Sequence, residues 1–303
     1  MKIKSFIKDN KKIFVGILIG MLISSGSVYA ASIKSKNVSY DNSSSKLTST
    51  NIQGTIDEVY KVATDELYNA QKECPEGYDC LSYFQNDSWK TIESNIKKGN
   101  SSRYAVGNTK EIDMGSYGKH TLRIANISTC PSYVDSETAC GFVVEFEDII
   151  DNRSMMSTNT NVGGWPASEI RTYLNDTIFK ALPDDLKSII ADTKVISGYG
   201  STVEDLDSNN FISNDKLYLL SAAEIWPDCR MDSAYAYTRQ LDYYKLRYVT
   251  EKNYSSLAKG DAWLLRTALK NDDHSFYSIS GNGYQLYNSG NVKSGISPAF
   301  RIE

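Results

Sequence analysis

Histidine is scarce in this 303-residue chain, which contains two, His120 and His274. Neither accompanies a G-x-S-x-G elbow or another nucleophile motif, so the sequence does not indicate a serine or cysteine catalytic triad. Neither belongs to a cysteine and histidine pattern with zinc-ligand spacing, so no metal site of that kind is expected. A glycine-rich phosphate loop is also missing. These absences leave a glycosidase-type pair of carboxylates as the enzymatic chemistry that remains open.

A concentrated basic face is missing too. The formal net charge is −4, with Lys and Arg mixed among the acids. Nucleic-acid binders concentrate positive charge on one surface, so nucleic acid is not an expected partner. Tyrosine, by contrast, is abundant at 21 residues. Surfaces rich in Tyr, Asn and Ser are typical of binding proteins, and the alternative is a β-rich fold that carries its tyrosines on strands.

The chain has one long apolar run, and it lies at the N-terminus. Lysines precede the apolar stretch 13–23, and Val28-Tyr29-Ala30 follows it. This order predicts a secretory signal peptide over 1–30 with cleavage after Ala30, and therefore an exported protein, either extracellular or at the cell surface. The run is shorter than the ~20 residues of a spanning helix. If it stays uncleaved, we expect a short membrane tether.

A Ser/Asn/Thr-rich stretch over 31–50 predicts a disordered linker. The next segment, 51–73, predicts an amphipathic helix, because Ile52, Ile56, Val59 and Ala63 fall on one face. Two interpretations remain open for this helix. It forms a coiled-coil stalk that makes a homo-oligomer through residues 52–70, or it packs as a single helix on the main domain.

Five cysteines suit an oxidising compartment. By proximity alone we pair Cys74 with Cys80, which gives a disulfide loop over 74–82, and Cys130 with Cys140. Cys229 is left over, either as a free buried thiol or as an intermolecular bond.

An acidic loop over 204–215 begins like a calcium loop, with Asp205, Asp207 and Asn209. Its sixth position is Asn210 instead of Gly and its twelfth is Lys216 instead of Glu, so it departs from the EF-hand pattern at both informative positions. A solvated loop without a cofactor is the prediction, and a non-standard calcium site is the alternative.

The segment 83–303 predicts a globular α+β domain with a mixed or antiparallel sheet and flanking helices. Strands are predicted over 111–114, 120–127, 141–146, 195–196, 216–220, 263–266, 276–279 and 298–302. Helices are predicted over 87–98, with Asp87 as its cap, over 163–191, divided at Pro183, and over 233–248. In 120–127 apolar and polar residues alternate, which predicts a half-buried strand.

An ordered set of motifs runs through this domain. It comprises Gly163-Gly164-Trp165, Ile170-Arg171, Leu174-Asn175, 215–221 with Glu224, 263–266 and Pro298-Ala299-Phe300. The set resembles a family of secreted bacterial proteins, the domain of unknown function 6273, over about 89–302. More remotely, the arrangement is similar to the C-type-lectin-like superfamily. The resemblance implies a C-type-lectin-like sheet with flanking helices, and its fold alone does not fix a function.

The motif residues are predicted to be structural. They are Gly164, Trp165, Arg171, Asn175, Asp215, Ser221, Glu224, Trp263, Arg266, Phe300 and Arg301. Buried arginines must be paired, so Arg171, Arg266 and Arg301 are expected to join helix to sheet through Asp215 or Glu224. An anion site is the alternative.

The last hairpin is the candidate binding site. Aromatic rings and amides gather there, and both suit sugars or peptides. The candidate residues are Asn282, Tyr284, Tyr287, Asn288 and Asn291. The alternative is an ordinary turn-rich hairpin. We therefore predict a domain that binds an extracellular glycan or protein and is not an enzyme, against two rivals: a glycan or cell-wall hydrolase with two carboxylates, and an oligomeric structural protein.

Overall fold

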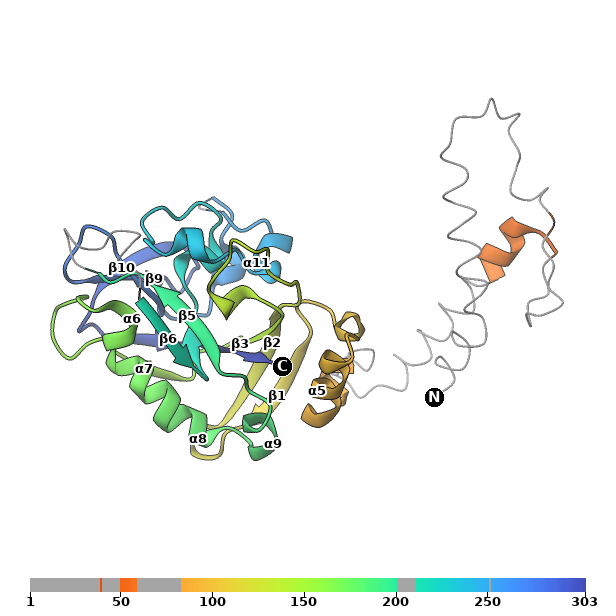
Figure 1. Cartoon of the computed structure of the whole chain (residues 1–303), viewed down its shortest axis with the longest axis horizontal. Coiled ribbons are helices and arrows are strands. Elements are labelled where there is room, and N and C mark those ends of the chain that lie inside the picture. Colours follow the sequence, from red (N-terminus) through yellow and green to blue (C-terminus); the bar gives the residue numbers. More distant parts are fainter. Residues whose placement is uncertain (1–38, 40–49, 59–82, 201–210, 251) are drawn as a thin grey trace, which may run out of the picture. The chain divides into compact units, whose positions relative to one another are not determined.

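The computed structural model describes residues 39, 50–58, 83–200, 211–250 and 252–303 (Figure 1). The predicted signal peptide, most of the predicted linker, the end of the 51–73 helix and the 74–82 loop lie outside these residues. Within the first unit, residues 52–58 are helical. The Asn51 side chain caps this helix by accepting the Gly54 N–H at 2.8 Å. Among the described residues no helix is long and apolar enough to cross a membrane.

The second unit, 82–303, is an α+β fold built on two five-stranded sheets. The first sheet has the order β1-β2-β3-β12-β7 and is antiparallel throughout. Its strands are Thr109–Asp113 (β1), Lys119–Asn126 (β2), Phe142–Phe146 (β3), Pro298–Ile302 (β12) and Tyr218–Leu219 (β7). The C-terminal strand therefore lies inside the sheet, between β3 and β7, as the apolar run at 298–302 predicts.

The second sheet has the order β10-β9-β8-β11-β4, in which the β8–β11 pair is parallel. Its strands are Gln285–Ser289 (β10), Ser275–Ile279 (β9), Trp263–Ala268 (β8), Ser294–Ile296 (β11) and Asp151–Arg153 (β4). A separate hairpin pairs β5 (Thr193–Ser197) with β6 (Phe211–Asp215). The predicted α+β class with antiparallel sheets is confirmed.

Short helices connect the strands. They are α4 (Tyr83–Asn86), α5 (Trp89–Lys97), α6 (Gly164–Ala167), α7 (Glu169–Tyr173), α8 (Phe179–Ala181), α9 (Asp184–Lys187), α10 (Ala222–Ile225) and α11 (Asp242–Leu246). Single 3-10 turns lie at η2 (Ser101–Arg103), η3 (Gly115–Tyr117), η4 (Glu137–Ala139), η7 (Tyr235–Tyr237) and η8 (Ser255–Leu257). The π-helical η5 (Leu174–Ile178) continues α7 directly into α8.

Several boundaries differ from the sequence prediction, for local reasons. Ser88 caps α5 instead of Asp87, whose carboxylate pairs with Arg103 at 3.0 Å. The segment predicted as one helix up to Pro183 is divided, because Ser168 leaves the helical conformation and caps α7. The predicted helix over 233–248 is reduced to η7 and α11. In the predicted strand 216–220 only Tyr218–Leu219 pair, whereas Phe211–Asp215, predicted as loop, form β6.

The predicted half-buried strand is also wrong in its burial. In β2, the residues from Leu122 to Asn126 are all buried, so both faces of the strand are covered. Arg123 is buried because Glu145 on β3 accepts two of its N–H groups, at 2.9 and 3.1 Å. A paired arginine can therefore occupy a position that the alternation assigned to solvent.

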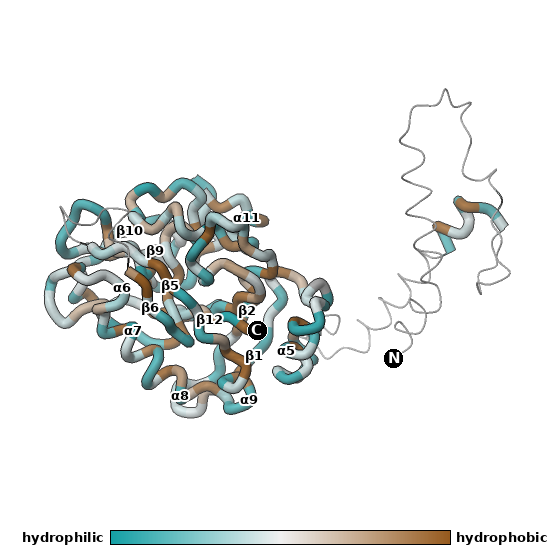
Figure 2. Tube along the Cα trace, viewed as in Figure 1, coloured by the Kyte–Doolittle hydropathy of each residue, from teal (hydrophilic) through white to brown (hydrophobic). Residues whose placement is uncertain are grey.

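The core lies between the sheets and the helices that cover them. Apolar stretches follow the strands, and polar ones follow many of the outer loops (Figure 2). The largest buried side chains include Trp165, Trp263, Tyr218, Phe276 and Phe300. The Cys130–Cys140 disulfide is present, with the two Cα atoms 5.0 Å apart, as predicted.

Candidate functional site

The motif residues around α6 and α7 form a structural cluster with β6. Arg171 Nε donates to Asp215 at 2.7 Å, and Trp165 Nε1 donates to the other oxygen of the same carboxylate at 2.9 Å. The Asn175 amide accepts the N–H groups of Lys216 and Leu217, at 2.8 and 3.0 Å. These contacts join α7 to β6 through Arg171 and Asp215, one of the two acids that were expected as partners.

Gly164 allows this cluster to close. Its φ is +53°, and a Cβ at this position would lie 2.1 Å from the carbonyl oxygen of Gly198. Only glycine fits such a close backbone approach. The Gly-Gly-Trp motif therefore has a packing explanation.

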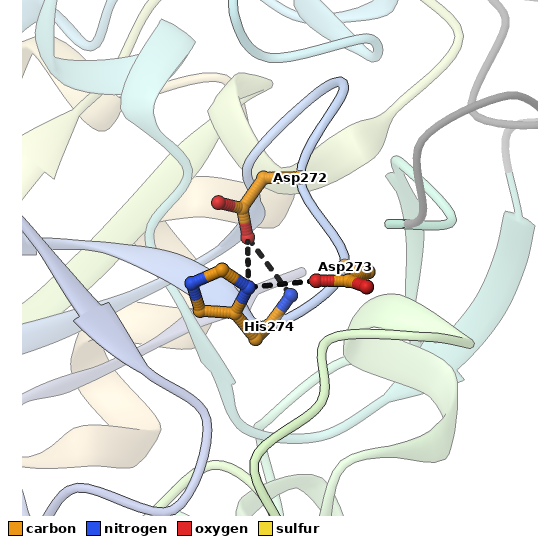
Figure 3. A group of neighbouring side chains, drawn as sticks. All are labelled: Asp272, Asp273 and His274. Atoms are coloured by element: carbon orange, nitrogen blue, oxygen red, sulfur yellow. Dashed lines mark hydrogen bonds and ion pairs between the residues drawn. The ribbon is translucent and has the colours of Figure 1, made fainter.

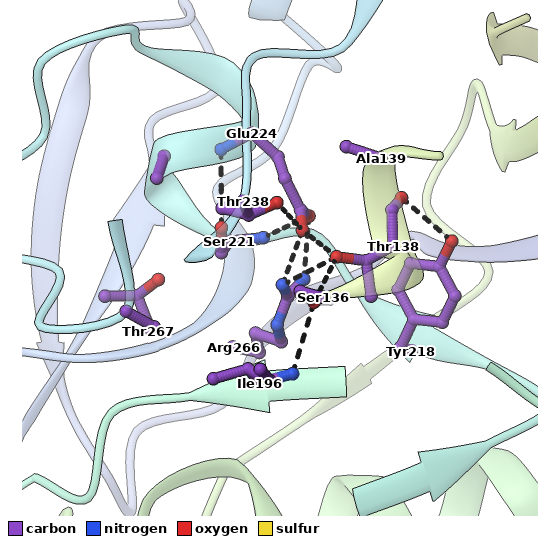
Figure 4. Close-up of polar contacts among 12 residues, drawn as sticks. Ser136, Thr138, Ala139, Ile196, Tyr218, Ser221, Glu224, Thr238, Arg266 and Thr267 are labelled. Carbon is purple, nitrogen blue, oxygen red and sulfur yellow. Dashed lines mark hydrogen bonds and ion pairs between the residues drawn. The ribbon is translucent and has the colours of Figure 1, made fainter. Parts of the chain in front are cut away.

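A second cluster surrounds Arg266 and Glu224, both of which are fully buried (Figure 4). Arg266 donates to the two Glu224 oxygens at 2.5 and 2.7 Å, and also to the Leu219 carbonyl at 2.7 Å. Burial opposes the charge of Arg266, but Glu224 still raises its pKa above the ordinary value. Ser221 and Glu224 form a reciprocal capping box at the start of α10. The arginine on β8 thus holds α10 against the sheet.

The remaining motif residues are structural as well. Phe300 is fully buried in β12, and Trp263 Nε1 donates to the Leu257 carbonyl at 3.0 Å. Arg301 differs from the prediction, since its partners are Glu137 at 3.4 Å and Glu303.

Both histidines have local partners. The ring nitrogens of His120 lie 2.6 Å from Asp148 and 2.9 Å from the Tyr117 carbonyl. His274 lies 2.7 Å from Asp273 and close to Asp272, so that three groups with metal-ligand chemistry stand together (Figure 3).

Asp272, Asp273 and His274 lie together because they form a turn before β9. Asp272 Oδ1 accepts the backbone N–H groups of His274 and Ser275, at 2.8 and 2.5 Å. Partial burial of Asp272 acts to raise the pKa of its carboxyl group, but these hydrogen bonds outweigh that effect and the pKa is lowered. Its oxygens thus cap the start of β9, and we assign the group to the turn and not to a metal. The candidate calcium ligands Asp205, Asp207 and Asn209 lie outside the described residues.

The five candidate binding residues on the last hairpin are not brought together. Asn282 and Asn291 lie beyond opposite ends of β10. The Asn288 side chain donates to Ser294, and the Tyr284 ring packs edge-on to Tyr254 at 6.3 Å. Of the five, Tyr287 belongs to the lining of a cavity between described segments of the chain.

That cavity has a volume of about 660 Å³, within the usual range of small-molecule sites. Its walls come from three segments of the chain: the loop after α10, the turn after α11, and strands β9 and β10. The lining residues are Trp226, Pro227, Asp228, Cys229, Arg230, Met231, Thr250, Lys252, Tyr277, Gln285 and Tyr287.

Hydrogen bonds fix the walls to one another. Gln240 Nε2 donates to the Ile225 carbonyl at 2.7 Å and to the Val249 carbonyl at 3.4 Å, which holds the first two walls side by side. The Cys229 thiol donates to the Tyr277 hydroxyl at 3.3 Å and so joins the first wall to β9. The cavity is therefore largely pre-formed.

The β9–β10 wall presents two tyrosines and an amide. Tyr277 and Tyr287 are direct cross-strand partners, with ring centroids 5.0 Å apart and edge-to-face. Gln285 Nε2 donates to the Tyr287 hydroxyl at 2.7 Å. A side-chain hydrogen bond with Tyr287 also contributes, after burial and Cys229, to raising the pKa of Tyr277, so the hydroxyls of the two tyrosines interact. The Tyr287 ring is half exposed, at 50%, and is available to a ligand.

The loop wall adds an aromatic ring and a thiol. Trp226 is only 4% exposed, and its indole nitrogen has no hydrogen-bond partner among the described residues. Burial, with help from the Asp232 carboxylate, raises the pKa of Cys229 to about 12. The thiol is thus protonated at neutral pH and unsuited to nucleophilic catalysis.

Three exposed charges stand at the cavity, on Asp228, Arg230 and Lys252. Within the described part of the chain, neither Arg230 nor Lys252 has an ion pair. Asp228 is the one carboxylate in the lining. Sequence reasoning identified Tyr287 but missed the rest of the lining, because these residues come from three separate segments of the chain. The signal available was weak: Trp226 and the odd cysteine Cys229 stand three residues apart.

Residues 142–303, more than half of the chain, match the family described as Domain of unknown function (DUF6273). The chain belongs to this family. The expected resemblance is confirmed from Phe142 onward, so the matched region contains all the motif residues and every residue of the cavity lining. No curated protein and no solved structure matches the chain.

Proposed function

We propose that the DUF6273 region is a ligand-binding module of an exported protein, and that its site is the cavity beside Tyr287. The observation that carries the proposal is the chemistry of this cavity: three aromatic rings, an amide and unpaired cations surround a pre-formed space. Apolar walls with a few directed polar groups are typical of binding sites. Export rests on the signal-peptide pattern at 1–30, and the ligand is an extracellular glycan or protein.

The lectin-like interpretation of the fold belongs to the same proposal. Support comes from the C-terminal strand β12, which lies between β3 and β7 in one sheet, and from the Trp263 strand β8 at the centre of the other. Such an arrangement leaves the loops between strands free to vary, and two of the three cavity walls include loops.

A hydrolase with two carboxylates is less well supported at this cavity. Asp228 is the one acid among the described lining residues, whereas both glycosidase mechanisms need two carboxyl groups that face each other across the substrate. The stalk hypothesis concerns residues 52–70, most of which lie outside the described residues, and it stays a prediction.

The test compares two tyrosines of one hairpin. Tyr287 is 50% exposed and lines the cavity, and Tyr284 is 45% exposed and does not. Each makes one edge-to-face contact with a neighbouring tyrosine. The full chain, Tyr287→Ala and Tyr284→Ala are tested for binding to immobilised glycans and cell-wall fractions, with and without calcium.

We expect Tyr287→Ala to weaken binding roughly tenfold or more, since a central aromatic contact is typical of an energetic hot spot. Tyr284→Ala should bind like the wild type. Equal losses in both variants, or turnover of the fractions without saturable binding, would contradict the proposal.

A further inference from the structure

Proton donors and positive charge dominate the cavity. The cationic side chains are Arg230 and Lys252, against the single carboxylate of Asp228. The lining also carries the Gln285 amide and the Tyr287 hydroxyl, which are hydrogen-bonded to each other at 2.7 Å. A ligand that complements this surface must offer acceptors and negative charge.

Two exposed basic residues belong to the cavity lining, Arg230 and Lys252. Within the described part of the chain neither has an ion-pair partner. Both charges can therefore meet an anion that enters the site. Arg is suited to bidentate recognition of planar or tetrahedral anions, and Lys adds a point charge.

The aromatic wall restricts the ligand further. The Tyr287 ring meets Tyr277 edge-to-face and remains half exposed, so it can stack on a flat apolar surface. The faces of sugar rings offer such C–H surfaces, and their hydroxyls suit the Gln285 amide. A simple inorganic anion would leave this wall and most of the ~660 Å³ unused.

We propose that the cavity binds an acidic saccharide, a sugar ring that carries a carboxylate, sulfate or phosphate group. The ring stacks on Tyr287, and Arg230 and Lys252 bind the acidic group. This inference rests on the proposed function and specifies the ligand class of the same site.

The experiment uses saccharides in matched pairs. Each acidic sugar is paired with its neutral counterpart: a uronate with its methyl ester, and sulfated or phosphorylated sugars with the forms that lack the group. Binding of the full chain to each pair is measured by calorimetry at low and high NaCl. The acidic member should bind at least tenfold more tightly, and added salt should reduce this preference.

Variants then assign the preference to the cavity. Arg230→Gln combined with Lys252→Gln should abolish it. The matched control combines Lys245→Gln with Arg247→Gln, since these exposed basic residues near the end of α11 do not line the cavity. The control should keep the preference. Asp228→Asn should tighten binding of the acidic member several-fold, because it removes a like charge.

Three outcomes would overturn the inference: equal binding of acidic and neutral members, an equal loss in both double variants, or no saccharide binding at all. The proposed function fails separately. It survives any of these results if Tyr287→Ala, and not Tyr284→Ala, abolishes binding to a protein or a cell-wall fraction.

Discussion

Two regions of the domain use the same kinds of side chain for opposite purposes, and α10 joins them. At its start, Glu224 and Arg266 form a fully buried ion pair, with further bonds to Thr138 and Leu219. At its end, Trp226 leads into the cavity, where Arg230 and Lys252 are exposed and unpaired within the described chain. A buried charge without a partner is costly because it has lost its hydration, whereas an exposed charge is solvated by water and needs no partner. The charges of the buried scaffold are therefore paired within the fold, whereas the exposed charges of the cavity lining need no partner from the protein.

The largest expected effect comes from breaking the buried pair. Arg266→Met leaves Glu224 as an uncompensated buried charge, so we expect the free energy of unfolding to fall by about 3–5 kcal/mol. Arg230→Met should change it by less than about 0.5 kcal/mol, because that side chain is exposed. Urea unfolding of both variants measures the contrast.

The double variant Arg266→Met with Glu224→Met sharpens the result. It removes both charges, so it should lose less stability than Arg266→Met alone. If the two arginine variants were equally stable, the distinction between scaffold and site would be lost.

The next effect concerns the thiol at the cavity wall. Because burial raises the pKa of Cys229 to about 12, its thiolate fraction at pH 8 should be roughly a thousandfold below that of an ordinary cysteine. Alkylation by iodoacetamide should be correspondingly slow in the native protein and should accelerate as the pH rises towards 12.

Unfolding in urea gives the control for this measurement, since the same thiol then regains its ordinary pKa and reacts fast. Rapid modification of the native protein at pH 8 would show that the wall around Cys229 is open, and would remove the argument for a pre-formed cavity.

The smallest expected change in stability concerns an exposed residue with a left-handed backbone conformation. Tyr248 follows the C-cap of α11 with φ +52° and is 79% exposed, a position where glycine is favoured. Tyr248→Gly should therefore raise the free energy of unfolding by about 0.5–1 kcal/mol. Asn271→Gly, at φ +61°, should gain less because Asn tolerates this conformation. A loss of stability in Tyr248→Gly would mean that the ring contributes contacts despite its exposure.

Local rules predicted much of the scaffold. The closing strand at 298–302, the strand at 263–266 and the Cys130–Cys140 disulfide follow from apolar runs and from proximity along the chain. The pairing of Arg171 and Arg266 with acids followed from the cost of a buried charge, although the sequence left open which acid each would take.

Periodicity failed where tertiary contacts dominated. The alternation in β2 predicted one solvent-exposed face, but Glu145 on the neighbouring strand allows Arg123 to be buried. The helix predicted from residue 163 up to Pro183 included Ser168, yet Ser168 ends α6 and its side chain caps α7. The periodicity of one segment does not show that Glu145 pairs with Arg123 or that Ser168 caps a helix.

The amino-acid sequence by itself determined the α+β class, the family motifs and the residues that must be paired or buried, because these depend on composition and on neighbours along the chain. The tertiary structure decided which exposed residues share a site. Tyr287 is joined to Trp226, Arg230 and Lys252 only because β10, the loop after α10 and the turn after α11 meet in space. The positions of these segments in the sequence do not show that they are neighbours in space. Strand pairing and the hydrogen bonds of Gln240 and Cys229 bring the three walls together.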